Sequence, residues 1–423
     1  MFSPIPNIES ISAGFSLERN FRFSQFSPRL FNYVTKKAGM VPGLIMPARC
    51  FCSDGSQGYP TMLLAKHFGT FPFDYGQIGG TFDFNRSPAF VTHGRDMVVV
   101  QATHVGYDPV TKKYGEYPRH RTSTDPANVT CTANCGLVKI LTKPYSDAYS
   151  TAASQTLVAK NRATGEYQVR LLDLFLSKEN ASRFPVIVEF DIPRMLRLSG
   201  TGNDAVAKYV SKDPVSRTFV ASDEFARHLS QYKQFADESS VEDGKFVPLG
   251  DALTPAWFKF PRADAKAEMG QYEKNLRDQM EWIVTQPAPL LAAAQVCAQS
   301  EFQRFLTEVY FAKSWFENRN LFYICGIMID VAPSADQLGS GCAFYPRSLF
   351  VPWAAYSQRF EKVEVEVLPS GATQVKTSGK FIKETWDQDR IFRELEAVDA
   401  TNDKAMLLDK EIERLVGLPP ISL

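Results

Sequence analysis

A thiol, a carboxylate and an isolated imidazole are the residues of this chain whose types could do chemistry together. Cys52-Ser53-Asp54 carries the first two groups, and His104 follows the apolar run 97–102. A second thiol, Cys135, precedes a glycine further along the chain. Two thiolates and one imidazole form a donor set with which zinc keeps its fourth position open for water or substrate. The sequence therefore predicts a zinc site, where Asp54 could accept a proton from such a water or fix its orientation.

Other cysteines and histidines compete with these donors. A cysteine two residues before Cys52 would share its face on a strand, because side chains alternate with a period of two. Another cysteine lies shortly before Cys135, and two histidines lie in polar stretches near His104. The pattern alone leaves these rival donors open: Cys50, Cys131, His93 and His120.

Composition limits the class of protein. The chain has 423 residues, 44% of them apolar, with 47 basic and 47 acidic side chains. This balance argues against a general nucleic-acid or membrane-surface binder, which needs a basic excess. No apolar run could span a bilayer. The seven scattered cysteines fit a reducing compartment, so we expect a cytoplasmic protein. The alternative is a plastid or another organelle stroma, because residues 1–37 are rich in Ser and Phe with few acids.

The elements that would position these residues alternate between strands and helices. Apolar runs predict strands over 44–48, 97–102 and 321–331, and helices over 61–67 and from 135 onward. Such alternation predicts an α/β fold with a mainly parallel central sheet flanked by helices. In such sheets ligands bind at the carboxyl ends of the strands, where the candidate donors fall.

The chain divides into three predicted regions. Residues 1–37 read as an N-terminal arm, and residues 38–352 as one α/β domain with a polar insertion near 194–264. Residues 353–423 are expected to form an extension with a hairpin, around 363–375, and a helix with Leu408, Ile412 and Leu415 on one face. Two apolar stripes at helical spacing precede the extension: Tyr272, Leu276, Met280 and Ile283, then Phe302, Phe305, Val309 and Phe316.

These motifs resemble the β-class carbonic anhydrases, and more closely the limiting-CO2-inducible B/C (LCIB/LCIC) family, a divergent β-type branch. The chain departs from the usual β-class pattern, because Ser56 stands where an arginine is expected and Tyr107 where a second thiol is expected. The resemblance covers roughly residues 40–145 and 270–352. The matching motifs are Cys52-Ser53-Asp54, Gly79-Gly80-Thr81-Phe82, His104-Val105-Gly106, Gly115-Glu116-Tyr117-Pro118-Arg119 and Cys135-Gly136.

The resemblance implies a β-carbonic-anhydrase-like fold and a zinc-dependent, reversible hydration of CO2 to bicarbonate through zinc-bound hydroxide. It implies Cys52, His104 and Cys135 as zinc ligands, since a glycine follows Cys135. It also implies Asp54 and Arg119 as a catalytic pair, although Arg121 and Arg95 are near enough to replace Arg119. The alternative is a catalytically silent scaffold in an inorganic-carbon complex. In either case we expect a homodimer that binds no nucleic acid.

Overall fold

The structure, a computed structural model, describes most of the chain, and its residues fall into two compact units. One unit comprises residues 1–139 and 290–423, and the other residues 140–289. The described ranges are 20–83, 96–108, 113–119, 130–133, 135–172, 186–199, 206–207, 209–212, 216–261, 270–311, 319–331, 347–359, 364–367, 373–376 and 388–398.

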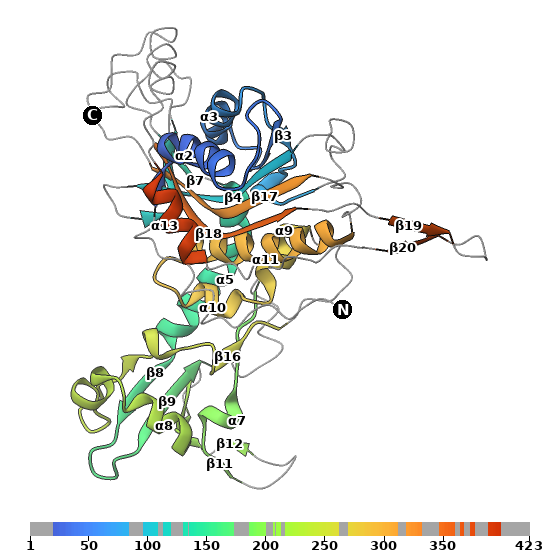
Figure 1. The fold of residues 1–423 in the computed structure, drawn as a ribbon. Helices are drawn as coiled ribbons and strands as arrows, with labels where there is room; N and C mark the ends of the chain where they lie inside the picture. The colour runs from blue at the N-terminus through green and yellow to red at the C-terminus, as the bar shows by residue number, and fades with distance from the viewer. Residues whose placement is uncertain are drawn as a thin grey trace. The chain divides into compact units, whose positions relative to one another are not determined.

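The first unit is built on a seven-stranded sheet (Figure 1). Its order is β1 (Phe21–Arg22), β18 (Arg347–Arg359), β17 (Asn320–Val331), β4 (Asp96–Asp108), β2 (Ile45–Cys50) and β3 (Phe73–Asp74), with β5 (Lys113–Tyr114) paired to β4. The pairings from β17 through β4 and β2 to β3 are parallel, and the others are antiparallel. The fold is therefore α/β with a mostly parallel central sheet, as predicted.

Strands from both sides of the polar stretch complete this sheet. β17 pairs in parallel with β4 from Leu321↔Met97 to Val331↔Tyr107. Both strands are almost continuously buried, as expected for a parallel sheet covered on both faces. The predicted strands at 44–48 and 321–331 are confirmed as β2 and β17.

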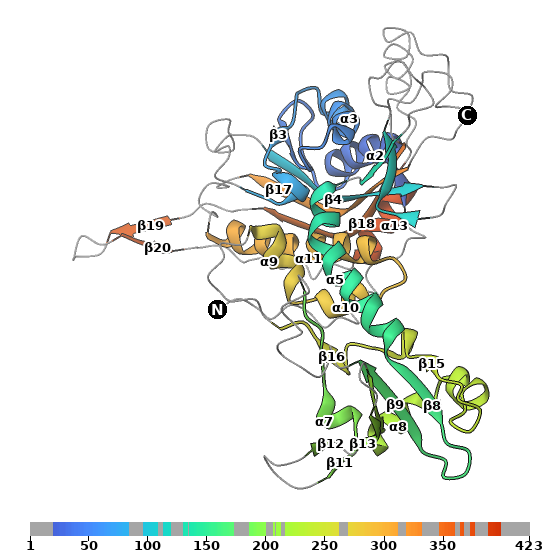
Figure 2. The same cartoon turned by 180° about the vertical axis from the view of Figure 1, so that it is seen from behind.

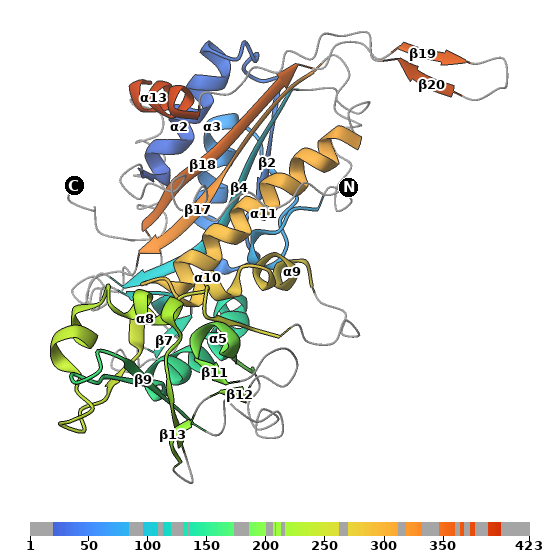
Figure 3. The same ribbon diagram turned by 90° about the horizontal axis from the view of Figure 1, so that it is seen from below.

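Helices cover both faces of the sheet. Figures 1 and 3 show α2 (Phe23–Lys36), α3 (Gly58–Phe68) and α13 (Gln388–Ala397) on one face and α11 (Pro289–Phe311) on the other. Helix α2 departs from the expected N-terminal arm, because Phe23, Phe26 and Leu30 are buried in the core. The aromatic side chains recur at helical spacing in α2, a period that the many serines around them obscured.

The expected hairpin is confirmed as β19 (Glu364–Val367) and β20 (Thr373–Lys376), which pair antiparallel. The expected helix with Leu408, Ile412 and Leu415 lies outside the described residues. Strands β6 (Glu116–Arg119) and β7 (Thr130–Ala133) form a second hairpin of the first unit.

The second unit has its own antiparallel sheet, seen from behind in Figure 2. The order is β13 (Tyr209–Lys212), β14 (Ser216–Val220), β9 (Tyr167–Leu172), β8 (Leu157–Lys160) and β15 (Val247–Pro248). Shorter elements complete it: β10 (Glu189–Phe190), β16 (Phe258–Lys259), α7 (Ile192–Met195), β11 (Leu198–Ser199), β12 (Val206–Ala207) and α8 (Asp223–Leu229). The polar stretch near 194–264 is thus part of a larger folded unit with a buried core that includes Phe219, Phe225 and Trp257.

The first apolar stripe belongs to two short helices rather than one. α9 (Gln271–Arg277) ends before α10 (Met280–Val284), yet Tyr272, Leu276, Met280 and Ile283 are all buried, as the spacing predicts. Of the second stripe, Phe302, Phe305 and Val309 lie on α11, and Phe316 lies outside the described residues. None of the described helices is long and apolar enough to cross a membrane.

Candidate metal centre

The three predicted donors meet at one point of the first unit. Ligand atoms of Cys52, His104 and Cys135 all lie within 4.8 Å of one another, and all three residues are buried. Cys52 comes two residues after β2, His104 lies on the neighbouring β4, and Cys135 directly precedes α5 (Gly136–Gln155). Segments far apart in the sequence therefore form a Cys-His-Cys group that could bind a metal.

The parallel pairing of β2 and β4 explains why Cys52 and His104 meet. Cys50, the last residue of β2, is opposite Gln101 of β4. Because the strands are parallel, Cys52 and His104 both come a few residues beyond this pair in the same direction. The prediction that His104 follows its strand is wrong, because β4 continues to Asp108. Polar residues within a buried strand are the reason: Thr103 and His104 follow the apolar run, yet both are fully buried.

A buried carboxylate orients the imidazole. Nδ1 of His104 lies 3.1 Å from Oδ2 of Asp330, which is on β17 and fully buried. An Nδ1–H that donates to this carboxylate leaves Nε2 as the ligand atom. Nε2 is buried and has no hydrogen-bond partner among the described residues. Two thiols and a buried imidazole can bind zinc once they lose their protons to the metal, so the donor set fits zinc.

Other polar groups hold Asp330 in turn. Ser348 Oγ donates to its Oδ1 at 3.0 Å, while Ser56 Oγ and Gln57 Nε2 donate to Oδ2 at 3.0 and 2.9 Å. These three hydrogen bonds fix the position of the carboxylate beside the imidazole. Asp330 was not among the predicted site residues. The signal was a single aspartate near the end of the apolar run 321–331.

The pKa values of the three donors are shifted in different directions. A hydrogen bond with the Cys135 thiol lowers the pKa of Cys52 to about 4, with a further contribution from His104. Burial acts in the opposite direction. The hydrogen bond to Cys52 and burial raise the pKa of Cys135. Burial lowers the pKa of His104, but Asp330 and Cys52 together raise it to about 10. The pocket thus stabilises a thiolate at Cys52, which is the form that binds metal.

The Gly-Gly segment is a tight turn against this thiolate. The backbone N–H of Gly79, in the 3-10 turn Ile78–Gly80, donates to Sγ of Cys52 at 3.1 Å. Phe82 is almost completely buried between Tyr75 and Phe305. The described contacts of this segment are those of a packed turn.

Cys135 occupies an unusual backbone position. Its φ of 53° lies in the left-handed region, and it is the one non-glycine residue with positive φ among those described. Its carbonyl accepts a hydrogen bond from the N–H of Val138 at 3.0 Å, in the first turn of α5. Such a conformation costs about 1–3 kcal/mol and tends to persist at functional sites. The thiol therefore lies directly before the N-terminus of α5.

The structure excludes one rival thiol from the donor group and leaves the other undescribed. Cys50 is fully buried, and burial together with the charge of Glu301 raises its pKa well above the ordinary value. It is not part of the Cys-His-Cys group. The side chain of Cys131, in β7 opposite Pro118, lies outside the described residues. The same holds for the other rivals: His93, His120, Arg95 and Arg121.

Of the expected catalytic pair, the structure describes the side chain of Asp54 but not that of Arg119. Asp54 is half-buried, caps the 3-10 turn η1 (Gly55–Gln57) and accepts a hydrogen bond from the N–H of Ser56 at 3.0 Å. Arg119 ends β6 opposite Thr130, and its side chain lies outside the described residues.

Of the comparisons with known proteins, the one with solved structures finds matches. No family model and no curated protein sequence matches the chain. The fold is similar to LCIB structures. PtLCIB4, a homolog of the limiting CO2-inducible protein LCIB, superposes with a TM-score of 0.44 at 10% identity, over 88% of this chain and 99% of that one. LCIB itself superposes with a TM-score of 0.33 at 8% identity, over 87% and 96% of the two chains.

Proposed function

We propose that this protein is a zinc-dependent carbonic anhydrase that interconverts CO2 and bicarbonate. The observation that carries the proposal is the buried group of Cys52, His104 and Cys135, with its donor atoms within 4.8 Å of one another. A zinc ion held there would supply a Lewis acid that lowers the pKa of a water to about 7. The motif resemblance around Cys52 and His104 supports CO2 as the substrate.

Other residues of the chain would orient the imidazole and the attacking water. Asp330 keeps the proton on Nδ1 of His104 and so leaves Nε2 free to bind. We assign Asp54 to accept a hydrogen bond from the attacking water and to aim its lone pair at CO2. Arg119 would keep the Asp54 carboxylate ionised and turned away from the metal.

The test is CO2 hydration by the zinc-loaded full chain, followed by stopped-flow with a pH indicator. We expect a rate well above the uncatalysed reaction, lost in Cys52→Ser and retained in Cys50→Ser. The Cys50 variant is a matched control, because it removes a buried thiol next to the site that lies outside the donor group. A zinc-loaded protein with no activity would contradict the proposal.

A second candidate is a catalytically silent scaffold that keeps the metal site. Ser56 favours it: the usual β-class arginine is absent at this position, and its hydroxyl instead donates to Asp330 at 3.0 Å. In this candidate, Arg119 does not supply the missing cation to Asp54.

The variant Ser56→Arg separates the two candidates. In an active wild type, this change should lower activity, because it disturbs the hydrogen bonds to Asp330. In a silent wild type, the new guanidinium should produce measurable hydration while zinc content stays the same. The same stopped-flow assay with metal analysis distinguishes these results.

A further inference from the structure

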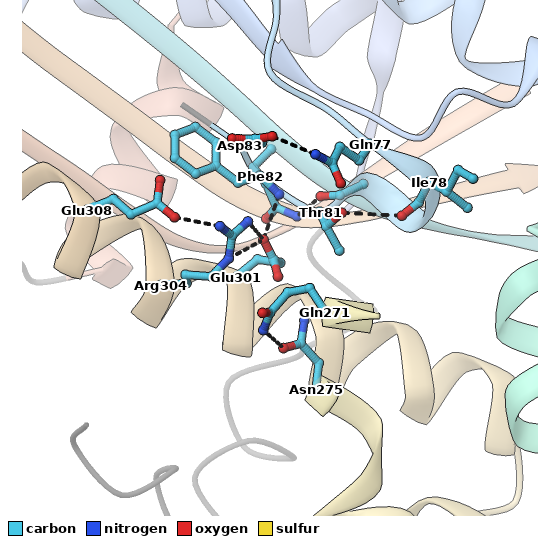
Figure 4. A network of polar contacts seen from close by, with 12 residues as sticks. Gln77, Ile78, Thr81, Phe82, Asp83, Gln271, Asn275, Glu301, Arg304 and Glu308 are labelled. Atoms are coloured by element: carbon cyan, nitrogen blue, oxygen red, sulfur yellow. Dashed lines mark hydrogen bonds and ion pairs between the residues drawn. The ribbon is translucent and has the colours of Figure 1, made fainter. Parts of the chain in front are cut away.

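A fully buried carboxylate on α11 lies behind the Gly-Gly turn. Glu301 Oε2 accepts a hydrogen bond from the backbone N–H of Phe82 at 2.7 Å (Figure 4). Arg304 donates to the same oxygen through Nε at 3.2 Å and Nη2 at 2.6 Å. A buried charge is costly unless it is paired, and here its partners are a guanidinium and the turn.

The same face of α11 clamps the side chain of Phe82. Residues three and four apart on a helix share a face, and Glu301, Arg304 and Phe305 do so. The Phe305 ring centroid lies 5.1 Å from that of Phe82, and the Arg304 guanidinium lies 5.6 Å from the Phe82 ring. Arg304 is held by Glu308 at 2.5 Å. Both the backbone and the ring of Phe82 are therefore fixed by this helix.

The turn between Phe82 and Gly79 is too tight to absorb a displacement. Gly80 N–H donates to Gln77 O, and Gln77 N–H donates to Thr81 O, both at 2.9 Å. Gly80 has a φ of 77°, and a Cβ there would lie 2.2 Å from the carbonyl oxygen of Ala102 on β4. Movement at Phe82 must then be passed to the Gly79 N–H, which donates to Sγ of Cys52.

We propose that Glu301 is a positioning residue of the metal centre: it holds the turn so that the Gly79 N–H stays directed at the Cys52 sulfur. This inference rests on the metal site of the proposed function. An N–H donor withdraws charge from a thiolate, and hydrogen bonds to ligating sulfurs tune the metal they bind. In a site with two thiolates, this donor would partly restore the Lewis acidity that the sulfurs remove.

The experiment uses Co²⁺ in place of zinc in the full chain and four variants. The readouts are the sulfur-to-cobalt charge-transfer band and the zinc affinity from chelator competition. Glu301→Ala should shift the band and weaken zinc binding by about tenfold, a loss typical of residues outside the ligands. Glu301→Gln should stay close to wild type, because its amide oxygen can still accept from Phe82.

Two glycine variants separate positioning from stability. Gly80→Ala should displace the turn against Ala102 and shift the band in the same direction as Glu301→Ala. Gly69→Ala is its matched control: its φ of 73° imposes similar strain, but a Cβ there has open space. We expect Gly69→Ala to lower stability without changing the band or the affinity. If Glu301→Ala does not fold, Gly80→Ala and Glu301→Gln decide the question.

An unchanged band and affinity in folded Glu301→Ala, or in Gly80→Ala, would overturn the inference. A band shift in Gly69→Ala equal to that in Gly80→Ala would also overturn it, because general strain would then be the cause. Neither readout depends on catalysis. If the wild type does not hydrate CO2 but the variants show the expected shifts, the result supports the inference and contradicts the proposed activity. If the wild type is active but the variants show no shifts, the result contradicts the inference alone. A wild type that binds no cobalt removes both.

Discussion

His104 and Asp330 lie on adjacent parallel strands, and their fully buried side chains meet with Nδ1 3.1 Å from Oδ2. The strand register places Asp330 opposite Gly106, two residues beyond His104. A carboxylate in this place fixes the tautomer and the orientation of a ligating imidazole.

Replacing this carboxylate tests its role. We expect Asp330→Asn to lower zinc affinity by about 10- to 100-fold, because the imidazole loses its charged acceptor. Ser348→Ala removes one donor to the same carboxylate and should have a smaller effect. Chelator competition measures both, and equal affinity in Asp330→Asn and wild type would contradict the assignment.

The ligand set predicts metal content. Changing Cys52 or Cys135 to Ser, or His104 to Ala, should abolish stoichiometric zinc, because two remaining protein ligands do not hold it tightly. Cys50→Ser and Cys131→Ser should retain zinc. Elemental analysis of the purified variants measures this. Zinc kept in Cys135→Ser but lost in Cys131→Ser would show that the second thiol was wrongly assigned.

The proposed catalytic pair predicts a separation of binding from activity. Asp54→Asn should keep zinc but lose CO2 hydration, because an amide cannot accept the proton in the same way. Arg119→Ala should also keep zinc and lower the rate. Parallel metal analysis and stopped-flow measure the two properties. Full activity in Asp54→Asn would remove this part of the mechanism.

His67 predicts a pH dependence of stability away from the metal centre. Burial lowers its pKa to about 4, and its Nδ1 lies 3.0 Å from Ser27 Oγ and 2.8 Å from Leu63 O. Above pH 6.5 the histidine is neutral in both the folded and the unfolded chain. As pH falls from 6.5 towards 4, only the unfolded chain takes up the proton, so stability decreases by roughly 1.4 kcal/mol per pH unit.

The variant His67→Gln checks this assignment. Its free energy of unfolding, measured in urea at a series of pH values, should fall less steeply than that of wild type over this window. Identical slopes would show that other groups cause the acid sensitivity.

We also expect a homodimer. The hairpin of β19 and β20 and the predicted helix with Leu408, Ile412 and Leu415 extend beyond the family resemblance, and their apolar residues need a surface to bury them. Light scattering after size exclusion at micromolar concentration should give twice the chain mass. A monomeric mass would contradict the expectation.

The sequence by itself determined the donor types and the strands near Cys52 and His104. Continuous apolar runs, such as the one that became β17, show a strand covered on both faces without any knowledge of its partners. Cys52 and His104 could be paired from the sequence because each comes shortly after such a run, and parallel neighbours bring equivalent ends together. The structure keeps this pairing, although β4 continues past His104 to Asp108. The same local patterns predicted α3 and the hairpin of β19 and β20.

Only the tertiary structure decided which groups complete the site. Asp330 is 226 residues from His104 in the chain, and no local pattern links two positions so far apart. The choice of Cys52 over Cys50 also depended on the path of the chain after β2, since alternation on an extended strand would give both thiols the same face. The contact from Glu301 to the Gly-Gly turn likewise needs α11 packed against the sheet. Local sequence determines periodicity and propensity, whereas these contacts arise only when the sheet and its helices assemble.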